Sequence, residues 1–430
     1  NYSGRERALA FGLLGGLAGA GVAAGPLIGG FVTSALTWRV VFAAETVIVA
    51  AILVFGVRRI QDSPKVSGVS LDKVGAALSA LGLGLIVFGI LKSSEWGLIT
   101  PTGALEISGT PITPFGFSVV PFLIAAGLCV LLAFRRWEQR VERAGAQPLL
   151  RPGLLASNSQ LRGGLAMFVS SYLIMAGSFF VLPLYLQLVL GKDALDTGIA
   201  ILPISVAMIL AAVAGGRLAD RISPRRIVRA GLAILFLGLI GLMASISPQL
   251  TSLLFSVSLA GFGAGIGLVV SQLGNVTMSA VGESQTSEVG GLQGASQSLG
   301  NSLGTALIGA ILLAGLTSGF HDRIRAEENI PADVQQEIVS GTEQGVQMIS
   351  RPTAEAIVNR AGLPPDQAEA VIDAYGDAQI DALKRALLGA SLFALVALWL
   401  AGDMPGRPLA QAEGSTGQLR GPEPQPLAKA

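Results

Sequence analysis

Ten apolar stretches, each about as long as a membrane crossing, dominate this sequence. A bilayer core about 30 Å thick needs roughly 20 apolar residues in a helix. Because hydrocarbon offers the backbone no hydrogen bonds, such stretches must be helical. The sequence therefore predicts an all-α integral membrane protein. The stretches lie at 8–32, 39–57, 74–91, 116–134, 164–190, 196–216, 227–246, 250–273, 289–316 and 384–402.

The composition argues against an enzyme. Charged residues make up 13% of the chain, against about 25% in a typical soluble domain. The single cysteine, Cys129, and the single histidine, His321, leave almost no material for a disulfide, a zinc site or Cys/His catalysis. The glycines at 261–267 lie in an apolar stretch without the lysine of a phosphate loop. We expect no cofactor, metal or nucleic acid.

The basic residues are distributed unevenly between the two membrane faces. Assigning the loops alternately to two sides places 20 Lys and Arg on the side of the N-terminus, and three in the short loops opposite. The positive-inside rule makes the first side cytoplasmic. The sequence thus predicts a multi-pass protein of the plasma membrane with both chain ends in the cytoplasm. Residues 405–430 are expected to form a disordered cytoplasmic tail.

A long acidic loop, 318–383, is predicted to lie outside the cell. It holds 12 Asp and Glu against four Arg, a net charge of −8. Its last part, from Asp366 onward, has helical spacing that favours a helix running into the last span. The loop is either a solvated extracellular cap or an acidic antechamber that concentrates cations.

The first apolar stretch carries a glycine pattern. Glycines four residues apart leave a helix stripe without side chains, onto which a second helix can pack closely. A proline within the stretch removes one backbone hydrogen bond and bends the helix. A generic packing face of small residues is the simpler interpretation. The residues are Gly21, Gly25, Pro26, Gly29 and Gly30.

A charged loop separates the stretches 196–216 and 227–246. A carboxylate among arginines at a helix end can form a charge-assisted latch between helices. The alternative is a basic cytoplasmic anchor in which the acid neutralises one charge. The residues are Gly216, Asp220, Arg221, Arg225 and Arg226.

Both patterns resemble motifs of the major facilitator superfamily. The glycine pattern resembles the antiporter motif in the fifth span of its drug exporters. The charged loop is similar to the family's cytoplasmic loop signature, although Ser223 and Pro224 stand where glycine is usual. Trp38, Arg39 and Phe42 are similar to the turn between spans five and six in the fourteen-span drug:proton antiporter branch.

Further likenesses at 183–203 and 272–305 extend the resemblance over nearly the whole chain. They imply a major facilitator type bundle that begins at the family's fifth span, with ten helices present and the first four missing. The implied domains are 1–60, the rest of the N-terminal half; 61–160, two linker spans; and 161–404, a six-span C-terminal half.

The resemblance implies export of small lipophilic molecules or drugs by proton antiport. Its expected partners are a small-molecule substrate, protons and membrane lipid. The substrate cleft of such transporters lies between two halves, so this chain alone is expected to be inactive and the function belongs to a longer parent. The alternatives are an exporter of a lipid or peptidic metabolite, and a non-transporting remnant or membrane scaffold.

Glu45 is the only acid well inside a predicted span. An acid in the membrane is costly and usually functional, so Glu45 is a candidate for carrying a proton or a cation. The alternative places it near the outer interface, paired with Arg39.

A polar stripe lies in the stretch 289–316. Gln293, Gln297 and Asn301 are four residues apart and share one helix face. They either line the substrate cavity or make hydrogen bonds between helices. Tyr185 and Gln187 are further cavity candidates, since aromatic rings can hold lipophilic cations.

Overall fold

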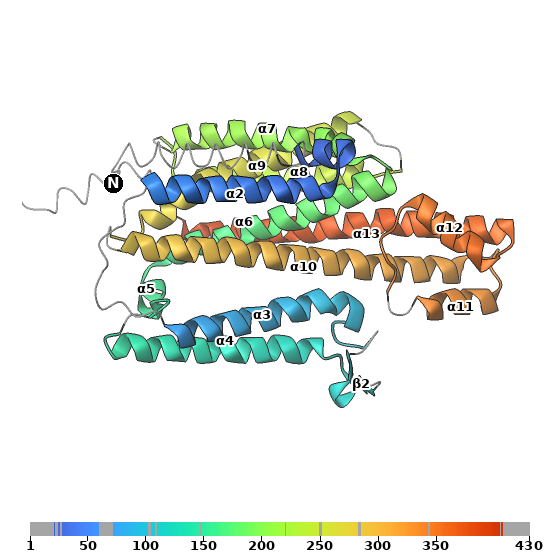
Figure 1. Ribbon diagram of the computed structural model, residues 1–430, viewed down its shortest axis with the longest axis horizontal. Helices are drawn as coiled ribbons and strands as arrows, with labels where there is room; N and C mark the ends of the chain where they lie inside the picture. Colours follow the sequence, from blue (N-terminus) through green and yellow to red (C-terminus); the bar gives the residue numbers. More distant parts are fainter. Residues whose placement is uncertain are drawn as a thin grey trace, which may run out of the picture.

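The described part of the chain is almost entirely helical (Figure 1). A computed structural model describes residues 28–59, 72–101, 105–107, 110–146, 148–219, 221–248, 252–282, 285–342 and 345–404, with Gly21, Gly25 and Gly406. A helical stretch at 28–35 leads into α2 (Trp38–Arg59). Next, α3 (Lys73–Trp96) and α4 (Val120–Arg143) form a hairpin. Their connection contains a short antiparallel ribbon of β1 (Leu105–Ile107) and β2 (Thr110–Ile112), and η1 (Pro114–Gly116).

The remaining elements form the main bundle and a cap at one of its ends (Figure 1). They are α5 (Pro152–Ser157), α6 (Ser159–Leu184), η2 (Tyr185–Val189), α7 (Ala194–Leu218), α8 (Pro224–Ser245), α9 (Ser252–Met278), α10 (Thr286–Ala326), α11 (Ala332–Gly341), α12 (Arg351–Ala361), α13 (Pro365–Leu400) and η4 (Ala401–Asp403).

Within the described ranges, nine helices are long and apolar enough to cross a membrane. They coincide with nine of the ten predicted stretches, which confirms the all-α, multi-span prediction. The other stretch, 8–32, lies mostly outside the described residues. Two helices, α10 and α13, run well beyond their apolar parts and carry the cap.

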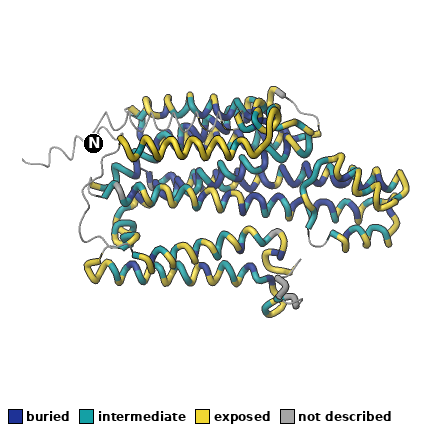
Figure 2. Tube along the Cα trace, in the orientation of Figure 1, coloured by how far each residue is buried: buried dark blue, intermediate teal, exposed yellow. Residues whose placement is uncertain are grey.

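Burial is concentrated inside the bundle of α6 to α10 and α13 (Figure 2). The outward faces carry many exposed large hydrophobic side chains, as expected of surfaces that meet lipid. In contrast, α2 has no buried residue along its length. The hairpin lies beside the bundle and reaches it mainly through the packing of α3 on α10.

Glycine seams join the bundle helices. Each residue turns a helix by about 100°, so residues two apart point to nearly opposite sides, and the alternating glycines of α9 serve two neighbours. A Cβ on Gly263 would lie 2.7 Å from the carbonyl carbon of Ile204 in α7, and one on Gly265 would lie 2.6 Å from the carbonyl oxygen of Gly231 in α8. Helix α9 therefore touches both neighbours backbone to backbone.

A similar seam joins α10 to α6. A Cβ on Gly304 would lie 2.9 Å from the carbonyl carbon of Leu173, and one on Gly300 would lie 2.5 Å from the carbonyl oxygen of Val169. Both glycines lie in α10, the helix that carries the polar stripe. The structure assigns them to helix packing.

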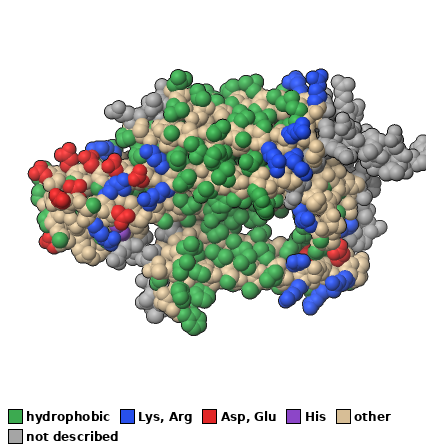
Figure 3. All heavy atoms as spheres, turned by 180° about the vertical axis from the view of Figure 1, so that it is seen from behind, with side chains coloured by type: hydrophobic (Ala, Val, Ile, Leu, Met, Phe, Trp, Pro, Cys, Tyr) green, Lys and Arg blue, Asp and Glu red, His purple; other side chains and the backbone are tan. Residues whose placement is uncertain are grey.

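The cap is formed by α11, α12 and the extended ends of α10 and α13. The Tyr375 hydroxyl accepts a hydrogen bond from the Ile349 amide at 2.8 Å, and Gln379 Nε2 donates to the Ile349 carbonyl at 2.7 Å. Thr317 Oγ1 accepts from the Val346 amide at 2.9 Å. The segment before α12 is thus held against both long helices. Acidic side chains gather on the cap's surface (Figure 3).

We expect Gly304→Ala to destabilise the protein by about 1–3 kcal/mol, because the new methyl group overlaps the backbone of α6. Gly294→Ala, in the same helix, is the control, since no described atom lies within 4 Å of its added Cβ. Detergent-induced unfolding of the purified variants measures both. Equal stability of the two variants would refute the seam.

Candidate functional site

The glycine pattern of the first span meets the bundle at one point. A Cβ on Gly30 would lie 2.8 Å from the carbonyl carbon of Ala194, at the first residue of α7. Around Gly21, Gly25 and Gly29 no described atom lies within 4 Å of such a position, and Pro26 is outside the described residues. Among the described residues, the pattern therefore packs closely at Gly30 alone.

The charged loop lies between α7 and α8. Ser223 has an extended backbone before α8, and Pro224 is the first helical residue, where its missing N–H costs nothing. This explains a Ser-Pro pair in place of glycine: it starts a helix. Among the described residues of the loop set, three are exposed: Gly216, Arg221 and Arg226.

Arg225 has a defined partner. Its Nε donates a hydrogen bond to the carbonyl oxygen of Met404 at 2.8 Å, just after η4. Asp220, the predicted acid of the latch, lies outside the described residues. This hydrogen bond joins α8 to the residue that follows η4, through a backbone carbonyl.

Glu45 is exposed on α2. Arg39 does not pair with it in the described part of the chain, because the Arg39 guanidinium lies over the Trp38 ring, 4.7 Å from its centroid. The structure thus gives no support for the surface ion pair that was the alternative for Glu45.

The polar stripe of α10 divides into two parts. Gln293 is half-buried, and its Nε2 donates to Thr277 Oγ1 of α9. Gln297 is half-buried and Asn301 is exposed. Gln293 therefore joins α10 to α9, whereas Asn301 is exposed.

Tyr185 and Gln187 lie in the π-helical turn η2. The Tyr185 side chain is 0% exposed, and its hydroxyl donates to the Ser247 carbonyl at 2.9 Å. Its ring lies 6.0 Å from that of Phe255. Tyr185 thus packs inside the bundle in this conformation, whereas Gln187 is exposed.

Sequence reasoning gave Gln272 no role of its own. Gln272 is 1% exposed, and its Nε2 donates to the Gly215 carbonyl at 2.9 Å, joining α9 to α7 beside the charged loop. The signal in the sequence that could have indicated this contact is the amide side chain of Gln272 within an apolar stretch.

A second overlooked cluster lies at the base of the hairpin. Asp72 caps α3 by accepting from the Gly75 amide at 2.8 Å and accepts from Trp137 Nε1 at 2.9 Å. Glu138, which is buried, accepts from the Leu150 amide at 2.9 Å. Because 65 residues separate Asp72 from Trp137, no local pattern could reveal this contact.

The nine apolar helices found among the described residues, and the glycine seams between them, define a multi-pass helical membrane protein. The chain belongs to the Major Facilitator Superfamily, whose sequence pattern matches residues 1–305.

Several relatives are named for antibiotic export or resistance. The chain is 28% identical over 321 residues to the "Probable actinorhodin transporter" of Streptomyces coelicolor, covering 73% of this chain and 52% of that protein. It is 30% identical to the "Tetracenomycin C resistance and export protein" of Streptomyces glaucescens, covering 75% and 56%. It is 25% identical to "Multidrug resistance protein Stp" of Mycobacterium tuberculosis, covering 78% and 58%. The chain spans a little over half the length of these relatives.

Proposed function

We propose that the natural protein exports small lipophilic molecules by proton antiport, and that this chain is the part that begins at the fifth of fourteen spans. The observation that carries the proposal is the match of about three quarters of the chain to proteins named for antibiotic transport, export or resistance. Glu45 would carry the proton, and Gln297, Asn301 and Gln187 would contact the substrate.

The surroundings of α2 support this proposal. An acid inside the membrane almost always faces a bundle interior, yet Glu45 is exposed and α2 has no buried residue. Additional helices packed on α2 would bury this carboxyl group. Such helices are what the N-terminal half of a longer exporter would supply.

The contact of Gly30 with α7 offers a route for coupling. It brings the end of the glycine pattern against the first turn of α7 without an intervening side chain. A movement of the helix that carries Gly30 would therefore act directly on α7. In the proposed exporter this contact seals the interface between the two halves on one side of the membrane.

We propose that the arginine-rich ends of α4 and α8 face the cytoplasm and the acidic cap faces outward. Figure 3 supports this: the cap lies at the end of the molecule opposite to most of the basic side chains. In a variant without Cys129, a cysteine replacing Ser340 in α11 should react in intact cells with a membrane-impermeant maleimide. A cysteine replacing Arg143 should react only after the cells are opened. The reverse pattern would invert the topology.

Glu45→Gln should reduce proton-driven efflux by the natural protein to the uncoupled background, because an amide cannot release a proton. Glu142→Gln is the control, since Glu142 is an exposed acid at the end of α4. Efflux of a fluorescent lipophilic cation from vesicles with an imposed pH gradient measures both. Unchanged efflux in Glu45→Gln would remove this residue from the mechanism.

A non-transporting membrane scaffold is the second candidate. Sequencing upstream of the codon for Asn1 distinguishes the two. We expect an open frame of about 130 further residues with four apolar spans. A start codon close to Asn1 would instead make the scaffold the better proposal.

A further inference from the structure

An opening lies between one part of the α3–α4 hairpin and the main bundle. Figure 3 shows that it passes through the molecule and is lined with hydrophobic side chains, with basic side chains near one end. In a bilayer, water would find no partners along such walls, and an empty slot would lose all dispersion contacts. Lipid chains are the natural filling of an apolar opening at this depth.

A cavity of about 400 Å³ lies where this hairpin meets the bundle. Its apolar walls come from α4, from α5 and from the segment before α5. Its rim carries Arg135 of α4 and Arg162 of α6. The apolar lining residues are Phe134, Leu150, Pro152, Leu155 and Ala156. The cavity thus combines an apolar interior with two cations at its mouth.

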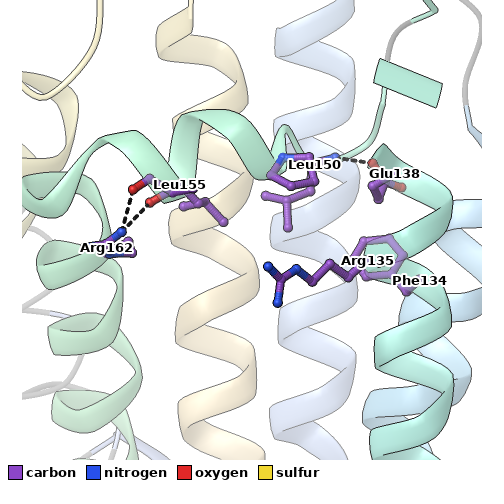
Figure 4. Close-up of a pocket in the computed structure, with 8 residues that line it drawn as sticks. Phe134, Arg135, Glu138, Leu150, Leu155 and Arg162 are labelled. Carbon is purple, nitrogen blue, oxygen red and sulfur yellow. Dashed lines mark hydrogen bonds between the residues drawn. The ribbon is translucent and has the colours of Figure 1, made fainter. Parts of the chain in front are cut away.

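The two arginines reach the cavity from opposite sides (Figure 4). Arg162 Nη1 donates to the carbonyls of Leu155 at 3.2 Å and Ala156 at 2.7 Å, which fixes its guanidinium at the end of α5 and leaves its other N–H groups available. Arg135 is exposed and makes no hydrogen bond or ion pair within the described part of the chain. Guanidinium groups bind phosphate by paired N–H donors.

The cavity also has an acid in its wall, Glu138. This side chain is 0% exposed, and its Oε2 accepts from the Leu150 amide (Figure 4). Its Oε1 is directed at α3, where a Cβ on Gly75 would overlap it. The carboxyl group therefore lies between Leu150 and α3, and the cavity lining carries two guanidinium groups and one carboxyl group.

We propose that an anionic phospholipid binds here, with its phosphate between Arg135 and Arg162 and its acyl chains in the opening beside the hairpin. The position of the cavity along α4 agrees with this ligand. The apolar part of α4 ends at Phe134, and arginines begin at Arg135. Basic pockets between membrane helices on the cytoplasmic side suit anionic head groups. The bound lipid would fasten the hairpin to α6.

The test uses the natural protein, purified in detergent and stripped of lipid, and native mass spectrometry with phosphatidylglycerol or phosphatidylcholine of identical chains. We expect phosphatidylglycerol to bind more tightly. Arg135→Gln with Arg162→Gln should weaken its binding about thirtyfold, since each arginine near a membrane surface contributes about fivefold. Arg136→Gln with Arg140→Gln, two exposed arginines of the same helix outside the cavity, should change it less than about twofold.

A second variant distinguishes loss of the lipid site from misfolding of the double arginine variant. Ala156→Trp fills the cavity without changing its charge, so it should weaken binding of both lipids while the melting temperature stays close to that of the wild type. Glycerol phosphate, which has the head group's charge but no chains, should not displace the lipid.

Four outcomes would overturn the proposal. They are equal binding of the two lipids, an equal loss in the control pair, full displacement by glycerol phosphate, and displacement by a transported molecule. Because binding is measured on purified protein, its result is independent of whether the protein transports. A failed efflux assay and a failed lipid assay are therefore distinguishable.

Discussion

In hydrocarbon, apolar side chains gain nothing by leaving one neighbour for another, so helices associate only where their surfaces approach closely. The rest of this structure depends on that constraint. Glycine removes the side chain at the point of contact, and α9 uses glycine toward α7 and α8 alternately. The contact of α10 with α6 follows the same rule at Gly300 and Gly304. The polar bonds of Gln272 and Gln293 then secure helices that are already close.

The positions of the spans could be predicted from the sequence, because long apolar stretches indicate helices that lie in lipid. The thickness of the bilayer then determines how long these helices are. Asp366 and the residues after it also showed helical spacing, and α13 begins at Pro365. The continuation of α10 as far as Ala326 was not predicted. Its polar last turns are held by packing that hydropathy does not report, including the Phe320 ring 6.0 Å from that of Tyr375.

The candidate site was harder to predict, because residue type alone does not say which way a side chain faces. Tyr185 is a predicted cavity residue, and residue type does not predict that its side chain is buried here with its hydroxyl bonded to Ser247. Gln293 and Asn301 share a stripe, yet only the first reaches a neighbouring helix among the described residues. The Asp72 and Glu138 cluster depends on the fold of the hairpin and has no local signature. The role of Glu45 in carrying a proton or a cation remains a prediction, which rests on its depth in the membrane.

Helix α10 has 41 residues, so it is about 60 Å long, roughly twice the hydrocarbon thickness. With α13 it forms a stiff pair of rods whose far ends project into the cap. Such a pair acts as a lever: a tilt of about 10° inside the membrane displaces a tip 30 Å beyond it by about 5 Å. The cap therefore magnifies small rotations of the bundle. A macromolecule that gripped α11 and α12 would in turn act as a brake on helix motion deep in the bilayer.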